Sequence, residues 1–190
     1  MCMGEELSAT SKDFDFDYED TRVRIVPITN LQEVKISDIT IGPLEEGKEF
    51  ETSFWIAEEF IKLGYAHFNE EDILTYATLN KLHWREIKLS PGLQVSALPN
   101  YFYPKLRRLL NTTRQRANKE PSAASQYLQA DRLARDIINC RLRKIVNLAA
   151  SSTRASSITQ ALSNEERILF EKVKKAVTDW EKSILENEIK

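Results

Sequence analysis

The sequence predicts an α+β protein, in which a small N-terminal β-rich domain is followed by an α-helical bundle of about four helices. Three observations predict this order. β-Branched and charged residues alternate soon after the N-terminus, and from residue 69 apolar residues recur at helical spacing. The length of 190 residues allows one large domain or two small ones. We expect an acidic, disordered tail at residues 1–20, a β-rich domain at residues 21–68 and a helical domain at residues 69–190.

The predicted tail carries seven acidic residues and one basic residue. Within it, residues 13–20 (DFDFDYED) alternate acids with Phe14, Phe16 and Tyr18. A period of two is compatible with an edge strand, and acidic–aromatic segments also fold onto partners. We favour a tail that is partly ordered against its own domain.

Strand chemistry follows directly after the tail. Residues 22–28 (RVRIVPI) alternate charged and β-branched residues, which predicts a strand with Val23 and Ile25 facing inward. A short helix is expected at residues 54–63, because Ser53 can cap its start and Gly64 can adopt the left-handed conformation that ends it. The strand pattern continues at Val34 and Ile36 and then at Ile39 and Ile41, and two further short strands are expected at residues 48–52 and 65–68.

Four helices are expected in the second domain. Asn69 is predicted to cap the first, with acids in its first turn where the helix dipole favours them, and this helix is expected to run to about Glu86 and to bury Trp84 or its neighbours. The last begins at a capping box formed by Ser163 and Glu166. The other two are expected at residues 101–118 and 125–150, and a flexible polar link at residues 151–157.

The helix at residues 125–150 is the element around which we expect the domain to be organised. Its apolar residues form a stripe wider than a surface helix needs, so much of its circumference should be buried. It also contains basic residues that few acids offset. A helix that is both broadly apolar and basic has more than one partner surface to satisfy.

Basic residues concentrate in one block of an otherwise acidic chain. Residues 101–154 contain twelve basic and three acidic residues, whereas the whole chain has a net charge of −2. Clustered cations can bind phosphates, so DNA contact is one interpretation. Salt bridges to a partner protein are the favoured interpretation, and a solvated surface is the third. The residues with which DNA contact is predicted are Arg107, Arg108, Arg114 and Arg116.

Catalytic chemistry has little support in the sequence. Two cysteines and two distant histidines give no metal-ligand spacing, and five glycines provide no phosphate-binding loop. We therefore expect no catalytic residue, no bound metal and no cofactor. The apolar runs are too short to span a membrane and the N-terminus lacks signal-peptide features, which favours a cytoplasmic protein.

A family resemblance adds to these inferences. It is carried by five short segments in a fixed order: Ile41-Gly42-Pro43 with Gly47, Phe54–Ala57 leading to Leu63–Ala66, Leu98–Tyr103, Arg135–Ile138, and Leu162-Ser163 with Glu165-Glu166. In their order and spacing, these segments resemble the GINS proteins of DNA replication. The resemblance covers about residues 21–187 and is greatest to the archaeal subunit type in which the small β-domain comes first.

The resemblance implies a non-catalytic scaffold subunit. Such a subunit pairs with a sister subunit of opposite domain order, in a two-plus-two heterotetramer, and links the MCM replicative helicase with a RecJ-like protein at the fork. It would be cytoplasmic and nucleoid-associated, with at most weak DNA contact. Our alternative is a stand-alone nucleic-acid-binding or regulatory protein that uses the basic helices. The predicted partner-interface residues are Tyr101, Phe102, Tyr103, Arg107, Arg108, Arg141, Arg143 and Lys144.

Overall fold

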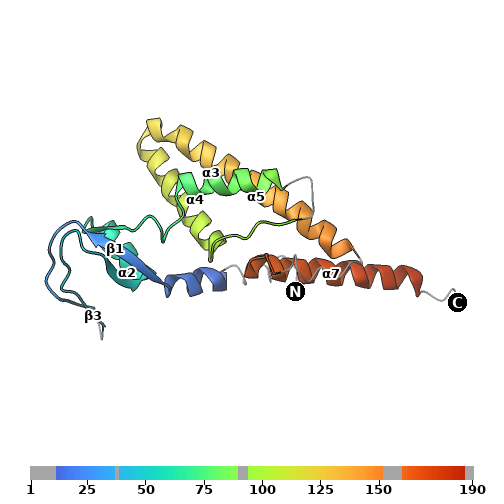
Figure 1. The fold of residues 1–190 in the computed structure, drawn as a ribbon, viewed down its shortest axis with the longest axis horizontal. Coiled ribbons are helices and arrows are strands. Elements are labelled where there is room, and N and C mark those ends of the chain that lie inside the picture. Colours follow the sequence, from blue (N-terminus) through green and yellow to red (C-terminus); the bar gives the residue numbers. More distant parts are fainter. Residues whose placement is uncertain (1–11, 37–38, 90–93, 152–159, 187–190) are drawn as a thin grey trace. The chain divides into compact units, whose positions relative to one another are not determined.

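A computed structural model describes residues 12–36, 39–89, 94–151 and 160–186 of the chain. The chain divides into two compact units, one formed by residues 12–74 and the other by the chain from residue 75 onward. Among the described residues, all the strands lie in the first unit, and the four long helices lie in the second (Figure 1). The predicted order of a β-rich part followed by a helical part is confirmed. The division falls at residue 74, six residues after the predicted boundary.

A three-stranded antiparallel sheet forms the centre of the first unit. Strand β1 (Arg22–Pro27) lies between β4 (Phe50–Ser53) and β5 (Ala66–Phe68). The inward side chains of β1 are Val23 and Ile25, as predicted, and both are buried in the core. Alternation of charged and β-branched residues therefore places one face of β1 in the core and the other toward solvent.

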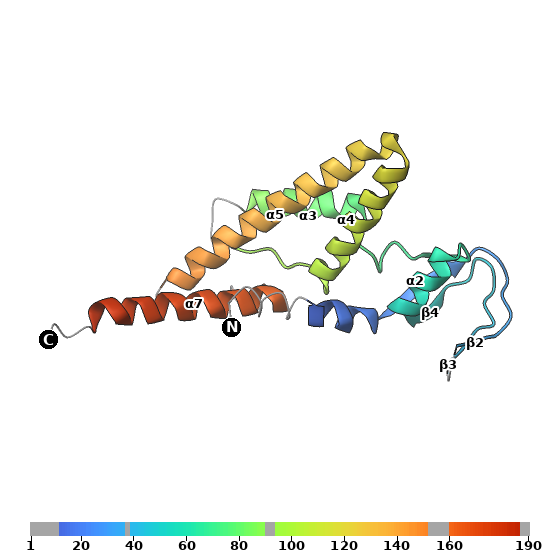
Figure 2. The same ribbon diagram turned by 180° about the vertical axis from the view of Figure 1, so that it is seen from behind.

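Helix α2 (Phe54–Lys62) packs against this sheet and supplies much of the core. Within this core, the ring of Phe54 stacks on that of Phe68, with their centroids 5.1 Å apart. Gly64 has a φ of 77°, the left-handed conformation that was predicted to end the helix. A separate two-stranded hairpin, β2 (Val34–Ile36) with β3 (Ile39–Ile41), is seen beside the sheet in Figure 2.

The segment before β1 is ordered and helical. Residues 12–19 form a helix, in a region for which a disordered tail was predicted, whereas residues 1–11 lie outside the described part. Tyr18 is buried in the core of the first unit, with its ring centroid 4.6 Å from that of Phe54. Burial of this aromatic ring explains the order, and it favours the interpretation of a tail packed on its own domain.

The first helix of the second unit begins later than predicted. Helix α3 (Tyr76–Lys88) is capped by Thr75, whose hydroxyl accepts a hydrogen bond from the amide of Thr78. Asn69 instead stabilises a turn, since its side-chain oxygen accepts from the amide of Glu71. The prediction of a cap at Asn69 was wrong because local side-chain hydrogen bonding competes with helix initiation.

Asp72 is held by Arg24 of β1. The backbone amide and Nε of Arg24 both donate to Oδ2 of Asp72, each at 2.9 Å, and Nη2 donates to Oδ1 at 3.0 Å. Glu71 also pairs with this guanidinium, at 2.9 Å. These two acids therefore pair with a side chain of the sheet and not with the start of a helix.

Helix α5 (Ala124–Ala150) is the central element of the second unit. It packs against α3, α4 (Phe102–Lys119) and α7 (Asn164–Leu185). A 3-10 turn, η1 (Pro121–Ala123), connects α4 and α5 into an antiparallel hairpin (Figure 2). The structure thus confirms about four helices organised around the long one. Of the predicted polar link after it, residues 152–157 lie outside the described part.

Helix α7 begins with the predicted capping box. Ser163 Oγ accepts from the amide of Glu166, and the Glu166 carboxylate accepts from the amide of Ser163 at 2.9 Å. Phe170, one turn later, packs into a core formed with the C-terminal part of α5. From residue 174 to 185, every side chain of α7 except that of Val177 is exposed.

Candidate functional site

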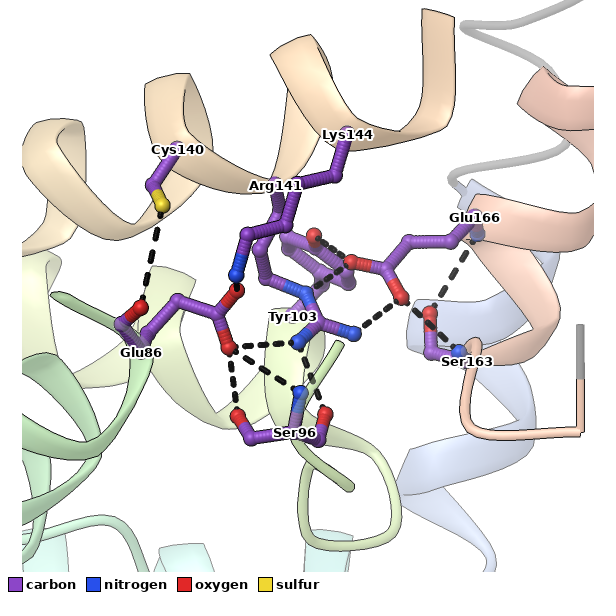
Figure 3. Close-up of polar contacts among 8 residues, drawn as sticks. All are labelled: Glu86, Ser96, Tyr103, Cys140, Arg141, Lys144, Ser163 and Glu166. Atoms are coloured by element: carbon purple, nitrogen blue, oxygen red, sulfur yellow. Dashed lines mark hydrogen bonds and ion pairs between the residues drawn. The ribbon is translucent and has the colours of Figure 1, made fainter. Parts of the chain in front are cut away.

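Four charged side chains are buried together inside the helical unit (Figure 3). Arg141 and Lys144 come from α5, Glu86 from α3 and Glu166 from α7, and each is at most 4% exposed. We call these four residues the buried charge cluster. It contains two cations and two carboxylates, so it is electrically balanced, as buried charges must be to persist in a protein interior.

Arg141 lies at the centre of the buried charge cluster. Its Nε and Nη2 donate to the two carboxylate oxygens of Glu166, at 2.5 and 2.7 Å. Its Nη1 donates to Oε2 of Glu86 at 3.1 Å. Lys144 Nζ donates to the other oxygen of Glu86 at 2.7 Å. The two parallel bonds to Glu166 are the geometry in which arginine binds a carboxylate most specifically.

Neutral groups complete the hydrogen bonding of the buried charge cluster. The Tyr103 hydroxyl of α4 donates to Glu166 at 2.7 Å. Ser96, in the segment between α3 and α4, donates its hydroxyl to Glu86 and accepts from Arg141 through its backbone oxygen at 2.8 Å. All four helices of the unit therefore contribute to one polar network. Among the described residues, no buried side-chain nitrogen or oxygen lacks a hydrogen-bond partner.

The surroundings of the buried charge cluster shift the pKa values of Glu86, Tyr103 and Arg141 in defined directions. Burial alone raises the pKa of Glu86, but hydrogen bonds from Lys144 and Ser96 outweigh it and lower that pKa below its ordinary value. Burial, together with the charge of Glu166, raises the pKa of the Tyr103 phenol. For Arg141, burial lowers the pKa, whereas the bonds to Glu166 more than reverse this and raise it. The shifts of Glu86 and Arg141 therefore both favour the charged form of the side chain.

Three of the residues predicted at a partner interface are buried within the chain. Arg141 and Phe102 have no exposed surface, and Lys144 is almost fully covered. The prediction that they contact a partner directly is corrected: Arg141 and Lys144 neutralise Glu86 and Glu166, and Phe102 packs edge-on against Tyr103. Tyr103 is itself half-buried, with its hydroxyl bonded to Glu166.

A signal for the buried charge cluster was present in the sequence. Glu86 follows Leu79 and Leu82 on the buried stripe of α3, at a position where an apolar residue is expected. Arg141 and Lys144 likewise interrupt the buried stripe of α5. Opposite charges on the apolar faces of two helices that pack together indicate mutual neutralisation.

The other predicted interface residues lie nearer the surface. Tyr101 is exposed in part and precedes α4 with a φ of 54°, and Arg143 is exposed on α5. Arg107 and Arg108 are half-buried, and each has an interaction within the chain.

The predicted DNA contacts do not form one exposed cluster. Arg114 and Arg116 lie exposed toward the end of α4, whereas Arg107 and Arg108 are half-buried. The basic block is thus divided between buried, half-buried and exposed positions, which composition alone does not reveal.

Two helices present apolar side chains that the described part of the chain does not cover. On α5, Ile138, Leu142 and Val146 follow one another at intervals of four residues and therefore form a line along one face. On α7, Trp180 and Ile184 are at least 60% exposed, although the sequence places them in the same apolar stripe as the packed part of that helix. We call these sets the α5 face and the α7 face.

Neither a metal-binding group nor a membrane-spanning helix is found among the described residues. Within residues 12–36, 39–89, 94–151 and 160–186, no three histidine, cysteine, aspartate or glutamate side chains are grouped so that they could hold a metal ion. The helices in these ranges also include none with the length and apolar character of a membrane span.

Comparison with known proteins identifies the helical unit. A family model described as "Sld5: GINS complex protein helical bundle domain" matches residues 72–185, which is more than half of the chain and includes the buried charge cluster and both apolar faces. No curated protein matches the sequence. The chain therefore belongs to the GINS family, whose members are non-catalytic subunits of a DNA-replication complex.

Proposed function

We propose that the chain acts as a scaffold, binding other GINS subunits through the α5 face and the α7 face. The observation that carries this proposal is the apolar stripe exposed on two helices of the helical unit. Solitary exposed apolar residues are ordinary on protein surfaces, whereas contiguous ones mark interaction sites. The length of α7 supports the same proposal, because residues 174–185 extend the helix well beyond its packed first turns.

The composition of the α5 face is typical of an interface. Its centre is aliphatic, and Arg135 and Arg143 flank it. Interfaces commonly combine an apolar centre with a polar rim, and arginine is enriched there whereas lysine is depleted. Arg135 is already paired with Asp131 at 2.7 Å, so Arg143 is the better candidate for an ion pair with a partner.

The partners we propose follow from the family resemblance. A sister subunit with the opposite domain order would complete a two-plus-two heterotetramer, in the archaeal type of GINS complex. The assembled complex would join the MCM helicase and a RecJ-like protein at the fork of a nucleoid-associated replisome. The first unit, which has its own sheet and core, would serve as a docking module for one of these proteins.

Co-expression with a candidate sister subunit tests this scaffold. Leu142→Asp places a charge in the centre of the α5 face, and burying an unpaired carboxylate in an interface is unfavourable. Asn147→Asp is the matched control, because it adds the same charge at an exposed position of α5 away from the α5 face. The proposal expects Leu142→Asp to prevent co-purification and Asn147→Asp to permit it. Equal recovery of both complexes would contradict it.

A nucleic-acid-binding function remains the second candidate. The exposed positions of Arg114 and Arg116, with Lys119 one turn further along α4, favour it. Phosphate contacts would make binding weaken as salt concentration rises. Replacing Arg114 and Arg116 together by Ala should reduce binding of the assembled complex to forked DNA. Binding that is unchanged by the double substitution would exclude these residues as DNA contacts.

A further inference from the structure

An exposed tryptophan on α3 lies beside three basic side chains. Trp84 is 65% exposed, although its aromatic ring was expected to help bury this helix. Lys81, Arg85 and Lys88 are exposed as well. The ammonium group of Lys88 lies 4.9 Å from the centre of the Trp84 ring. A large aromatic ring left in solvent within a folded unit is a candidate for ligand contact.

Helix geometry places the three cations on one side of Trp84. Successive residues are rotated by roughly 100° in a helix with 3.6 residues per turn. Lys88 and Lys81 are therefore displaced by about 40° and about 60° from Trp84, and Arg85 by about 100°, all in the same direction. Since each residue rises about 1.5 Å, the cations span about 10 Å along the helix. They form a row parallel to the axis, beside the indole ring.

No acid on α3 offsets this row of charge at the surface. Glu86 is the one acidic residue of the helix, and it is buried and neutralised by Arg141 and Lys144. On α5, which packs against α3, Asp136 pairs with His83, and the two atoms His83 Nε2 and Asp136 Oδ2 lie 3.3 Å apart. The exposed face of α3 is therefore positive.

The make-up of this face favours nucleic acid over protein as its ligand. Protein interfaces are depleted in lysine at their centres, and the aliphatic α5 face has that character. On α3, the exposed apolar residues beside the cations are Trp84, Ile87 and the small Ala77. Proteins that bind single strands combine cations along the backbone with aromatic rings on which bases stack.

We propose that the outer face of α3 binds single-stranded nucleic acid, with one base stacked on Trp84 and phosphates beside Lys81, Arg85 and Lys88. This contact goes beyond the assembly role proposed above, and it uses residues outside both apolar faces. Three cations predict that the logarithm of affinity falls with the logarithm of salt concentration with a slope of about −2 for a single strand. Recognition by stacking and phosphate contact tolerates any sequence.

The test measures binding of a fluorescein-labelled oligo(dT) to the full chain, alone and in complex with its sister subunit. Trp84→Ala should weaken binding about tenfold, since one stacked base contributes on that order, and Trp84→Phe should retain part of the affinity. Lys81→Ala combined with Lys88→Ala should reduce the salt slope. Phe16→Ala is the matched control, as it removes an aromatic ring of similar exposure that lies in the first unit and outside both apolar faces.

A second readout reports stacking directly. In a chain that keeps Trp84 while Trp55 and Trp180 are replaced by Phe, oligo(dT) should quench the tryptophan fluorescence. Unchanged fluorescence, or equal affinities for the wild type and Trp84→Ala, would overturn the proposal. Loss of the sister subunit from the Trp84→Ala protein would also overturn it, because α3 would then be a protein interface. An acidic peptide, such as polyglutamate, that competes as well as oligo(dT) would show a merely electrostatic surface and would overturn it too.

Discussion

Arg141 on α5 holds Glu166 on α7 through two parallel hydrogen bonds, in a position where neither side chain is reached by solvent. The same carboxylate closes the capping box at Ser163, so one residue both starts α7 and fixes it to α5. A buried ion pair of this kind adds little stability relative to an apolar pair of the same shape, but it admits few alternative packings. We infer that it sets the register of α7, and hence the direction in which the α7 face projects.

Glu166→Gln should destabilise the helical unit by about 3–5 kcal/mol, because it leaves Arg141 and Lys144 with one carboxylate between them in the interior. Chemical denaturation followed by circular dichroism measures the change. Glu165→Gln is the control, since Glu165 lies in the same helical turn outside the cluster and contributes at most about 1 kcal/mol through the helix dipole. Equal losses for the two variants would show that the capping position, and not the cluster, determines the stability.

Acid should weaken the helical unit through Glu86. Its pKa is lowered in the folded state by Lys144, Ser96 and Arg141, so its contribution to stability is present above the ordinary glutamate pKa of 4.5 and is lost as pH falls through the folded value. The free energy of unfolding, measured between pH 7 and pH 3, should decline below about pH 4.5. Glu86→Gln should be less stable at pH 7 and should show a shallower decline. If the free energy of unfolding of Glu86→Gln fell as steeply with pH as that of the wild type, Glu86 would not be the source of the acid sensitivity.

Tyr18 should be essential to the first unit, although it lies in a segment predicted to be disordered. Tyr18→Ala removes a buried ring from the core and should cost about 3 kcal/mol or more. Phe16→Ala, two residues away on the same helical segment, removes an exposed ring and should cost less than about 0.5 kcal/mol. The protection of the β1 amides from hydrogen exchange compares the stability of the two variants. Protection that is the same in both variants would mean that the core does not depend on this helix.

Arg143 and Arg141 should behave differently despite their proximity in sequence. Arg143→Ala should leave the free energy of unfolding unchanged within about 0.5 kcal/mol, because the side chain is exposed. It should instead accelerate dissociation from the sister subunit, as measured by surface plasmon resonance. Arg141→Ala should destabilise the unit by about 3–5 kcal/mol. An Arg143→Ala chain that dissociates at the wild-type rate would place the interface elsewhere.

Local rules predicted much of the fold. Alternation identified β1, and the Ser163–Glu166 pattern identified the start of α7, because both depend on residues close together in sequence. The prediction at Asn69 was wrong although it also rested on a local rule. The Asn69 side chain does accept a hydrogen bond from a nearby backbone amide, but the bond stabilises a turn and not a helix. The pairing of Asp72 with Arg24, 48 residues away, is a long-range contact that no local rule contains.

The site was harder to predict because its residues look alike in the sequence. Arg141 and Arg143 have the same chemistry two positions apart on one helix, yet one is buried and the other exposed. Arg141 can be buried because it faces the carboxylate of Glu166, which comes from another helix. Ile137 and Ile138 show the same for apolar residues: Ile137 is fully buried in the core, whereas Ile138 is exposed and belongs to the α5 face.

The most direct test of the scaffold proposal is the mass of the complex formed with a sister GINS subunit, measured by size-exclusion chromatography with light scattering. The wild type and Asn147→Asp should give one species of two-plus-two mass. Leu142→Asp, and separately Ile184→Asp, should give free chain with an unchanged circular dichroism spectrum. A complex of undiminished mass with both variants would contradict the proposal that the α5 and α7 faces hold the assembly together.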